Sequence, residues 1–428
     1  MIERLARRVI GALKAGCARL ALVMVTDPRA EKGKKWSLKQ LLEPVMVSMC
    51  AGKHSLAEVE QLSQDLSFPT RKALGLWRRV PDTTLRDVLV RISPASLVDG
   101  LTRQTRAAHR QKALQPVGLR FGVVGVDGKC TRIESWKHGY AQQQVGSDGG
   151  ARGMLRTMTC MLLSSRVPTC IHVAPIPPDT NEDGFFRQLV DQLLQLYAAI
   201  DLFRLVVADA GSCSLGNATY VREKQLHYLF ALNHKQPTLL AEAIRLLGSL
   251  PDSRAVARSE ERERGGIERR TLFVTTEMAG FHEWSHLVTV LRVRRQRWDD
   301  QGHLEFDHER YFMTSLRDAA MEPDEWLRLI RRYWSSVESG IHKVLDTTFV
   351  EDEHPWIPND DQGALNLLIL RRMAYNLVAL FRGRTQRSEE RRATPWKRMI
   401  DWFHNALISA TTEAVSGLRP RLEAASEC

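Results

Sequence analysis

Paired cysteines at metal-binding spacing are missing from this sequence of 428 residues. Its 7 cysteines are scattered, and no two of them form a Cys-x-x-Cys pattern. Neither a zinc ribbon nor a disulfide framework is therefore supported. Scattered single cysteines are typical of a reducing compartment, so we expect a cytoplasmic protein.

Long apolar runs are also missing. No run approaches the ~18 residues that a membrane-spanning helix needs, so we expect no membrane partner. Residues 7–25 faintly resemble a signal peptide, but Lys14 and Arg19 interrupt the apolar stretch. We interpret this segment as an amphipathic helix.

Acidic residues are outnumbered, with 50 Asp and Glu against 61 Lys and Arg and a formal net charge of +11. Such an excess favours a polyanionic partner, most simply nucleic acid. A hydrophobic content of 43% is that of an ordinary globular protein, and the length allows two or three domains.

Residues 1–115 read as a helical N-terminal domain. Ser37 and Ser55 can each cap a helix, with Gln40 and Glu58 three residues later to complete capping boxes. A further helix begins at Asp82 or Thr83. DNA binding and simple scaffolding are both open for this domain.

The pattern changes to strands and helices near residue 118. Strands are predicted over 121–127, 155–164 and 169–177, with a mobile loop over 138–152. A helix capped by Asn181 follows, then a strand ending at Asp209, a helix over 214–224 and a strand over 227–233. This order is typical of an α/β, ribonuclease-H-like core, in which the first and fourth strands are neighbours.

The rest of the chain completes a five-part organisation. We expect the helical domain over 1–115, the first part of the core over 118–240, a β-rich insertion over 241–312, closing helices that carry Glu338 over 313–382, and a basic linker with a C-terminal helix over 383–428. In the insertion, a basic segment with an aromatic end can contact a phosphate backbone or blunt an exposed edge strand: Arg294, Arg295, Arg297 and Trp298.

Two aspartates stand at the ends of apolar runs. Asp127 follows residues 121–126, and Asp209 follows a second run of β-branched residues. A turn aspartate is the simple interpretation of Asp127, since Asp-Gly favours turns. The alternative is that both, with Glu338 from a late helix, hold two divalent cations, Mg²⁺ with Mn²⁺ as a substitute.

A competing motif is His-Glu-Trp-Ser-His at 282–286, which matches the zinc protease pattern, with Glu305 as a third ligand. That chemistry needs both histidines on one face of a helix. The residues that follow are strand-like, so we reject a zinc site here.

Several blocks resemble DDE-type transposases of bacterial insertion sequences, in the ISAs-type branch related to the H-repeat-associated proteins. The blocks are G-V-V-G-V-D-G-K, V-V-A-D-A-G-S-C-S with Y-L-F-A-L-N-H-K-Q-P, E-R-Y-F-M-T-S-L, and Y-W-S-S-V-E-S-G-I-H-K-V-L-D-T-T-F-V-E-D with L-R-R-M-A-Y-N-L. The resemblance covers roughly residues 35–382. Ser339, Lys343 and His234 depart from the family pattern.

The resemblance implies that Asp127, Asp209 and Glu338 form a catalytic, metal-binding triad. It further implies cleavage at element ends, strand transfer to target DNA, and a homodimer on terminal inverted repeats in a bacterial cytoplasm, nucleoid-associated when bound. We also expect DNA contacts from three side chains near the triad: Lys129, His342 and Lys343. The alternatives are a domesticated DNA-binding protein without catalysis and a nuclease without strand transfer.

Overall fold

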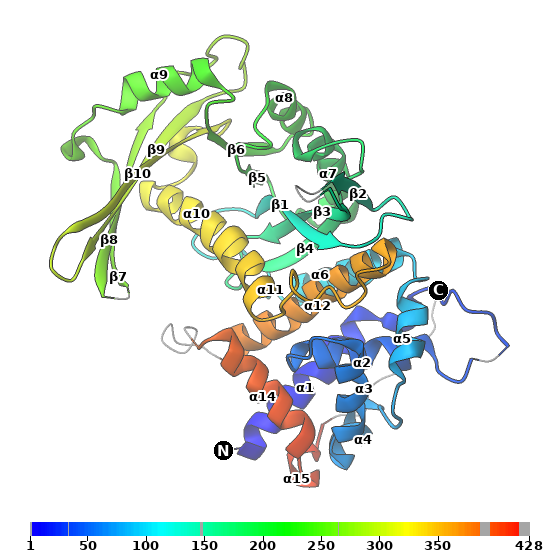
Figure 1. The fold of residues 1–428 in the computed structure, drawn as a ribbon. Coiled ribbons are helices and arrows are strands. Elements are labelled where there is room, and N and C mark those ends of the chain that lie inside the picture. The colour runs from blue at the N-terminus through cyan, green and yellow to red at the C-terminus, as the bar shows by residue number, and fades with distance from the viewer. Residues whose placement is uncertain (1, 33, 146–148, 264, 386–393, 419–428) are drawn as a thin grey trace.

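The computed structural model describes residues 2–32, 34–145, 149–263, 265–385 and 394–418, without the side chains of Ile2, Glu263, Glu338 and Ser339 (Figure 1). A mixed sheet with helices on both faces forms the centre. Helices from both ends of the chain pack together below it in the view of Figure 1. Within the described residues, four short 3-10 helices lie between the larger elements: η1 Leu22–Met24, η2 Ala198–Ile200, η3 Asp252–Arg254 and η4 Asp318–Ala320.

The N-terminal segment is helical, as predicted. Its helices are α1 Ile2–Leu20, α2 Leu38–Cys50, α3 Leu56–Asp65, α4 Phe68–Leu74, α5 Asp82–Leu89 and α6 Pro94–Arg110. Ser37 forms the predicted capping box with Gln40 at the start of α2. Ser55 caps α3, but the Glu58 carboxylate accepts from the His54 N–H instead, so the second box is incomplete.

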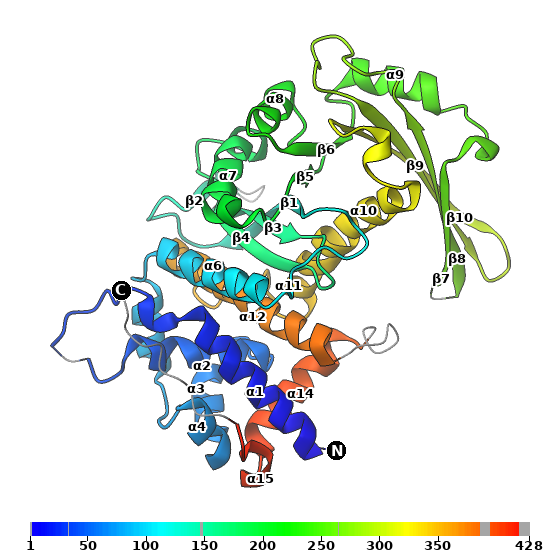
Figure 2. The ribbon, with the colours of Figure 1, turned by 180° about the vertical axis from the view of Figure 1, so that it is seen from behind.

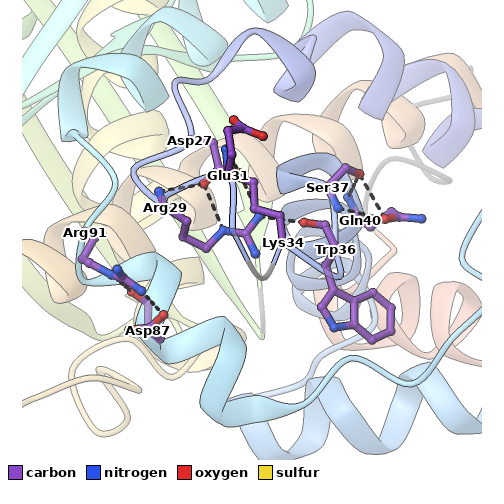
Figure 3. Close-up of polar contacts among 9 residues, drawn as sticks. All are labelled: Asp27, Arg29, Glu31, Lys34, Trp36, Ser37, Gln40, Asp87 and Arg91. Carbon is purple, nitrogen blue, oxygen red and sulfur yellow. Dashed lines mark hydrogen bonds and ion pairs between the residues drawn. The ribbon is translucent and has the colours of Figure 1, made fainter.

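The loop that leads into α2 is held by local polar contacts (Figure 3). The Arg29 guanidinium donates to the Asp27 carboxylate and, at 2.7 Å, to the Trp36 carbonyl. Lys34 pairs with Glu31 at 2.6 Å. These bonds fix the loop beside the capped end of α2.

The core sheet has the ribonuclease-H-like strand order. Its strands are β1 Val123–Ile133, β2 Ala141–Val145, β3 Ala151–Leu162, β4 Thr169–Pro175, β5 Leu205–Ala208 and β6 His227–Leu232. β1 pairs antiparallel with β3, whereas β1, β5 and β6 run parallel to one another. The predicted loop over 138–152 is wrong in part, because β2 forms a hairpin with β3 there.

A four-stranded antiparallel extension continues this sheet. It consists of β7 Ala257–Glu263, β8 Gly266–Thr275, β9 Thr289–Asp299 and β10 Leu304–Thr314. β10 pairs with β6, so the core and the extension form one ten-stranded sheet. The extension projects away from the N-terminal helices (Figures 1 and 2). α9, Pro237–Leu247, packs against β8 and β9 and was not predicted.

Two groups of helices cover the two faces of the core sheet. α7 Glu182–Tyr197 and α8 Leu215–Glu223 bury their apolar sides with Val124 and Val126, on one face. α10 Pro323–Ser336, the π-helical turn η5 Val337–His342 and α11 Lys343–Thr347 lie on the other face with Val123. The Asn181 side chain caps α7, as predicted, by accepting from the Gly184 N–H at 2.9 Å.

The longest helix, α12 Asp361–Thr385, joins the sheet to the helical part of the molecule. It packs against β4, α2 and α6, while α14 Trp396–Ser409 and α15 Thr412–Val415 pack on α1. Contrary to our reading of the sequence, α12 is long and apolar enough to cross a membrane. Its apolar window is 100% buried inside the protein, as in a core helix. Arg382 and Arg384 belong to its last turn, whereas Arg387, Arg391 and Arg392 of the predicted linker lie outside the described residues.

Candidate active site

Asp127 and Asp209 lie side by side at two neighbouring inner strands of the core sheet, β1 and β5. The parallel pairing of β1 with β5 ends with Val126 opposite Ala208, and the two aspartates are the next residues on each chain. Burial raises the pKa of Asp209, and the negative charge of Asp127 raises it further. The topology therefore brings together two carboxylates that are far apart in sequence.

Backbone amides orient both carboxylates. The Gly128 N–H donates to Asp127 Oδ1 at 3.0 Å, and the Gly211 N–H donates to Asp209 Oδ1 at 2.9 Å. Gly128 is the next residue of β1, which continues to Ile133, whereas Gly211 lies in the turn that follows β5. The interpretation of Asp127 as a turn aspartate is therefore wrong, and the strand predicted over 121–127 continues to Ile133 through its pairing with β3.

A third carboxylate, Glu182, reaches the same place and was missed in the sequence. It is the first residue of α7, and a Cβ added at Gly128 would lie 1.8 Å from its Oε1. A Cβ added at Gly211 would lie 3.3 Å from its Oε2. Burial raises the pKa of Glu182, and the charges of Asp209 and Asp127 add to the effect.

A signal for Glu182 was present in the sequence. Glycine follows each aspartate within two residues, and both glycines make room for this carboxylate. Glu182 also stands directly after the predicted cap of the first core helix. The charge of Lys235, just after β6, lowers the pKa of both Asp209 and Glu182, so it too lies near the acids.

Glu338 belongs to the π-helical turn η5, which packs against β1. Its side chain lies outside what the structure describes, so its convergence with the aspartates stays a prediction. Residues in and beside the turn do reach β1. The Tyr333 hydroxyl donates to the Val126 carbonyl at 3.1 Å, and His342 Nδ1 lies 3.4 Å from Asp127 Oδ2.

Lys129 ties β1 to the chain that follows η5. Its ammonium bonds Asp346 at 2.6 Å and Asp352 at 2.9 Å, and only 8% of the residue is exposed. In this arrangement the side chain is engaged within the protein. It fixes the strand of Asp127 relative to the turn of Glu338, and its predicted contact with DNA stays a prediction.

The predicted basic surface of the β extension is made of ion pairs. Arg294 pairs with Asp307 at 2.6 Å, Arg295 with Glu268 at 2.6 Å, and Arg297 with Glu305 at 2.5 Å. The Arg269 guanidinium lies over the Trp298 ring, 4.9 Å from the ring centroid. Carboxylates of neighbouring strands thus neutralise much of this surface.

The rejected zinc motif at 282–286 lies in turns between β8 and β9, with His282 at a φ of 50°. No helical face is present to bring the two histidines together. Glu305, the proposed third ligand, is bonded to Arg297.

Oxygen ligands suit a divalent cation at the aspartate pair. Among the described side chains, no three of His, Cys, Asp or Glu lie close enough together to hold a metal ion. The donor chemistry nevertheless fits Mg²⁺, because carboxylate oxygens are ligands that this ion prefers. The two carboxylates are half-buried, and the charge of Asp127 raises the pKa of Asp209, so a bound cation would offset their repulsion.

The fold and the aspartate pair define a mixed α/β protein with a ribonuclease-H-like core. The family described as Transposase DDE domain matches residues 120–377. The chain belongs to this family, and its general function is that of a transposase acting on DNA. No curated protein matches the chain.

Proposed function

We propose that this protein cleaves phosphodiester bonds at the ends of an insertion sequence and joins the freed ends to target DNA. Asp127, Asp209 and Glu338 are the proposed catalytic residues, in the ISAs-type branch that the sequence blocks resemble. The observation that carries the proposal is the adjacency of Asp127 and Asp209, which directly follow the last parallel pair of β1 and β5.

The proposed triad would hold two divalent cations, with Glu182 beside it. When bound, such ions activate an attacking oxygen and stabilise the leaving oxygen of a phosphodiester. The protein's own contribution is positioning. The backbone amides of Gly128 and Gly211 orient the aspartates, and His342 lies beside Oδ2 of Asp127.

The turn that carries Glu338 is held at the site from both of its ends. Tyr333, before the turn, bonds the carbonyl of Val126. Asp346, after the turn, bonds Lys129 on the same strand. These two contacts lie on either side of Asp127 in β1, so they keep the strand and the turn in fixed register.

A cleavage and joining assay tests this function. The purified full chain is mixed with a linear fragment carrying both element ends and their genomic flanks, a target plasmid, and either Mg²⁺ or EDTA. We expect cuts at the element ends and joined products only with Mg²⁺. Cutting without joining would identify a nuclease, and DNA binding without cutting would identify a domesticated protein.

A further inference from the structure

A cavity of about 680 Å³ lies beside the turn that carries Glu338. It is lined by the loop between β3 and β4, the end of α10, η5, α11, α12 and the start of α14. The described lining residues include no Asp or Glu. Four of them carry cationic side chains: Arg166, Lys343, Arg382 and Lys397. Such a lining suits a polyanion.

Arg382 packs against aromatic rings, and one N–H donor of its guanidinium is not used in a hydrogen bond within the described residues. Its guanidinium lies 5.7 Å from the ring centroid of Trp396, which stacks on Tyr375 at 4.9 Å. Its buried Nε has no hydrogen-bond partner among the described residues. Burial lowers the pKa of Arg382, and no carboxylate is among the groups that oppose this. A phosphate oxygen would satisfy such a donor.

The contrast with the β extension is direct. Arg294 and Arg297 there have carboxylate partners on the next strand. Lys343 and Arg382 instead face a cavity in which the described lining supplies hydroxyl groups and no acid. Charge complementarity therefore selects the cavity over the extension.

The cavity and the carboxylate site share one helical turn. Gly340 lines the cavity, and His342, two residues later, contacts Asp127. We propose that the cavity binds the phosphodiester backbone of duplex DNA, beside the segment that enters the active site. This inference rests on the proposed function, because it assigns a path to the same DNA.

The test is the salt dependence of binding to a short fluorescein-labelled DNA duplex, in EDTA so that no cleavage occurs. Plotted as the logarithm of the binding constant against the logarithm of salt concentration, wild-type binding gives a negative slope. The double variant Lys343→Gln/Arg382→Gln should reduce its magnitude by about 1.8, because each lost phosphate contact accounts for roughly 0.9. Arg382→Lys in the same assay keeps the charge and should retain most of the slope.

The matched control is Arg294→Gln/Arg297→Gln, which removes the same charge from the β extension. Its slope should equal that of the wild type. An unchanged slope in the cavity variant, or an equal loss in the control, overturns the assignment.

A second measurement needs no variant. The duplex should protect Lys343 and Lys397 of the wild type from acetylation, read by mass spectrometry. Lys224, which follows α8 and pairs with Asp191 of α7, should stay equally reactive. Equal protection by inorganic phosphate would identify a small-anion site and overturn the DNA assignment.

The two proposals fail in different ways. Wild-type protein that cuts DNA with Mg²⁺, while the cavity variant keeps its slope, contradicts only the cavity assignment. Wild-type protein that binds no duplex contradicts both proposals.

Discussion

Asp127 and Asp209 stand next to each other because Val126 and Ala208 form the last pair between the parallel strands β1 and β5. The charge of one carboxylate raises the pKa of the other. This repulsion between like charges means that the site is less stable without a cation than with one.

The first prediction concerns the stability of the metal-free protein. The folded state raises the pKa of Asp209, so ionisation of Asp209 costs folding free energy as pH rises through that pKa. Asp209→Asn should therefore raise Tm at neutral pH in EDTA. The difference should vanish under acidic conditions where the carboxylate is protonated in both states.

The same variant should lose its response to Mg²⁺. An ion at about 100 times its Kd stabilises the wild type by about 2.7 kcal/mol. Asp209→Asn should gain much less, because a ligand is missing. Thermal melts with Mg²⁺ and with EDTA measure both effects, and an equal gain in the two proteins would remove Asp209 from the metal site.

A second prediction concerns the space that Gly128 leaves for Glu182. Gly128→Ala puts a methyl group where the Glu182 carboxylate lies. The fold should lose less than about 1 kcal/mol, because the clash is with the end of a flexible side chain. Cleavage should fall at least about tenfold, since the carboxylate is displaced from the aspartates.

The double variant Gly128→Ala/Glu182→Gln separates this explanation from general disruption. Its cleavage rate should match that of Glu182→Gln alone, because both changes remove the same carboxylate from the site. Additive losses would mean that Gly128 matters for another reason. Full activity in Glu182→Gln would make Glu182 a bystander.

A third prediction separates an internal role of Lys129 from DNA contact. Lys129→Met removes the ion pairs with Asp346 and Asp352, so unfolding free energy should fall by about 1–3 kcal/mol. The salt dependence of duplex binding should stay unchanged. A reduced slope with unchanged stability would instead support the contact with DNA that the sequence suggested.

A fourth prediction concerns pH and a buried histidine. Burial lowers the pKa of His172, whose Nε2 bonds Gln192 at 3.0 Å. Below about pH 6.5 the unfolded chain binds a proton that the folded protein does not, so stability should fall as pH decreases. Urea unfolding across this range should show a weaker decrease for His172→Asn. An identical decrease in the variant would exclude His172 as a cause.

Much of the fold is predictable from local pattern. The apolar strand runs, the Asn181 cap and the helical spacing after it give the order of the core elements, and the order implies the neighbours of β1. β2 and α9 were missed. β2 is polar and gains its structure from pairing with β3, while α9 begins at Pro237 and packs on the extension.

The site was harder to predict than the fold. Asp127 and Asp209 carry a repeated strand-end pattern, so their adjacency follows from topology. Glu182 carries no such pattern, because its role depends on the approach of α7 to two glycines. The arginines of the extension show the opposite problem, since sequence reveals their charge but not the acids across the strand.

The most direct test of the central claim is the single-turnover rate of Mg²⁺-dependent cleavage of element-end DNA. Asp127→Asn and Asp209→Asn should each reduce the rate by about a thousandfold or more, because residues that act as one unit fail together. Glu283→Gln, in the rejected zinc motif, should cut at the wild-type rate. Cleavage by either asparagine variant at the wild-type rate, or loss of cleavage in Glu283→Gln alone, would contradict the assignment of this site.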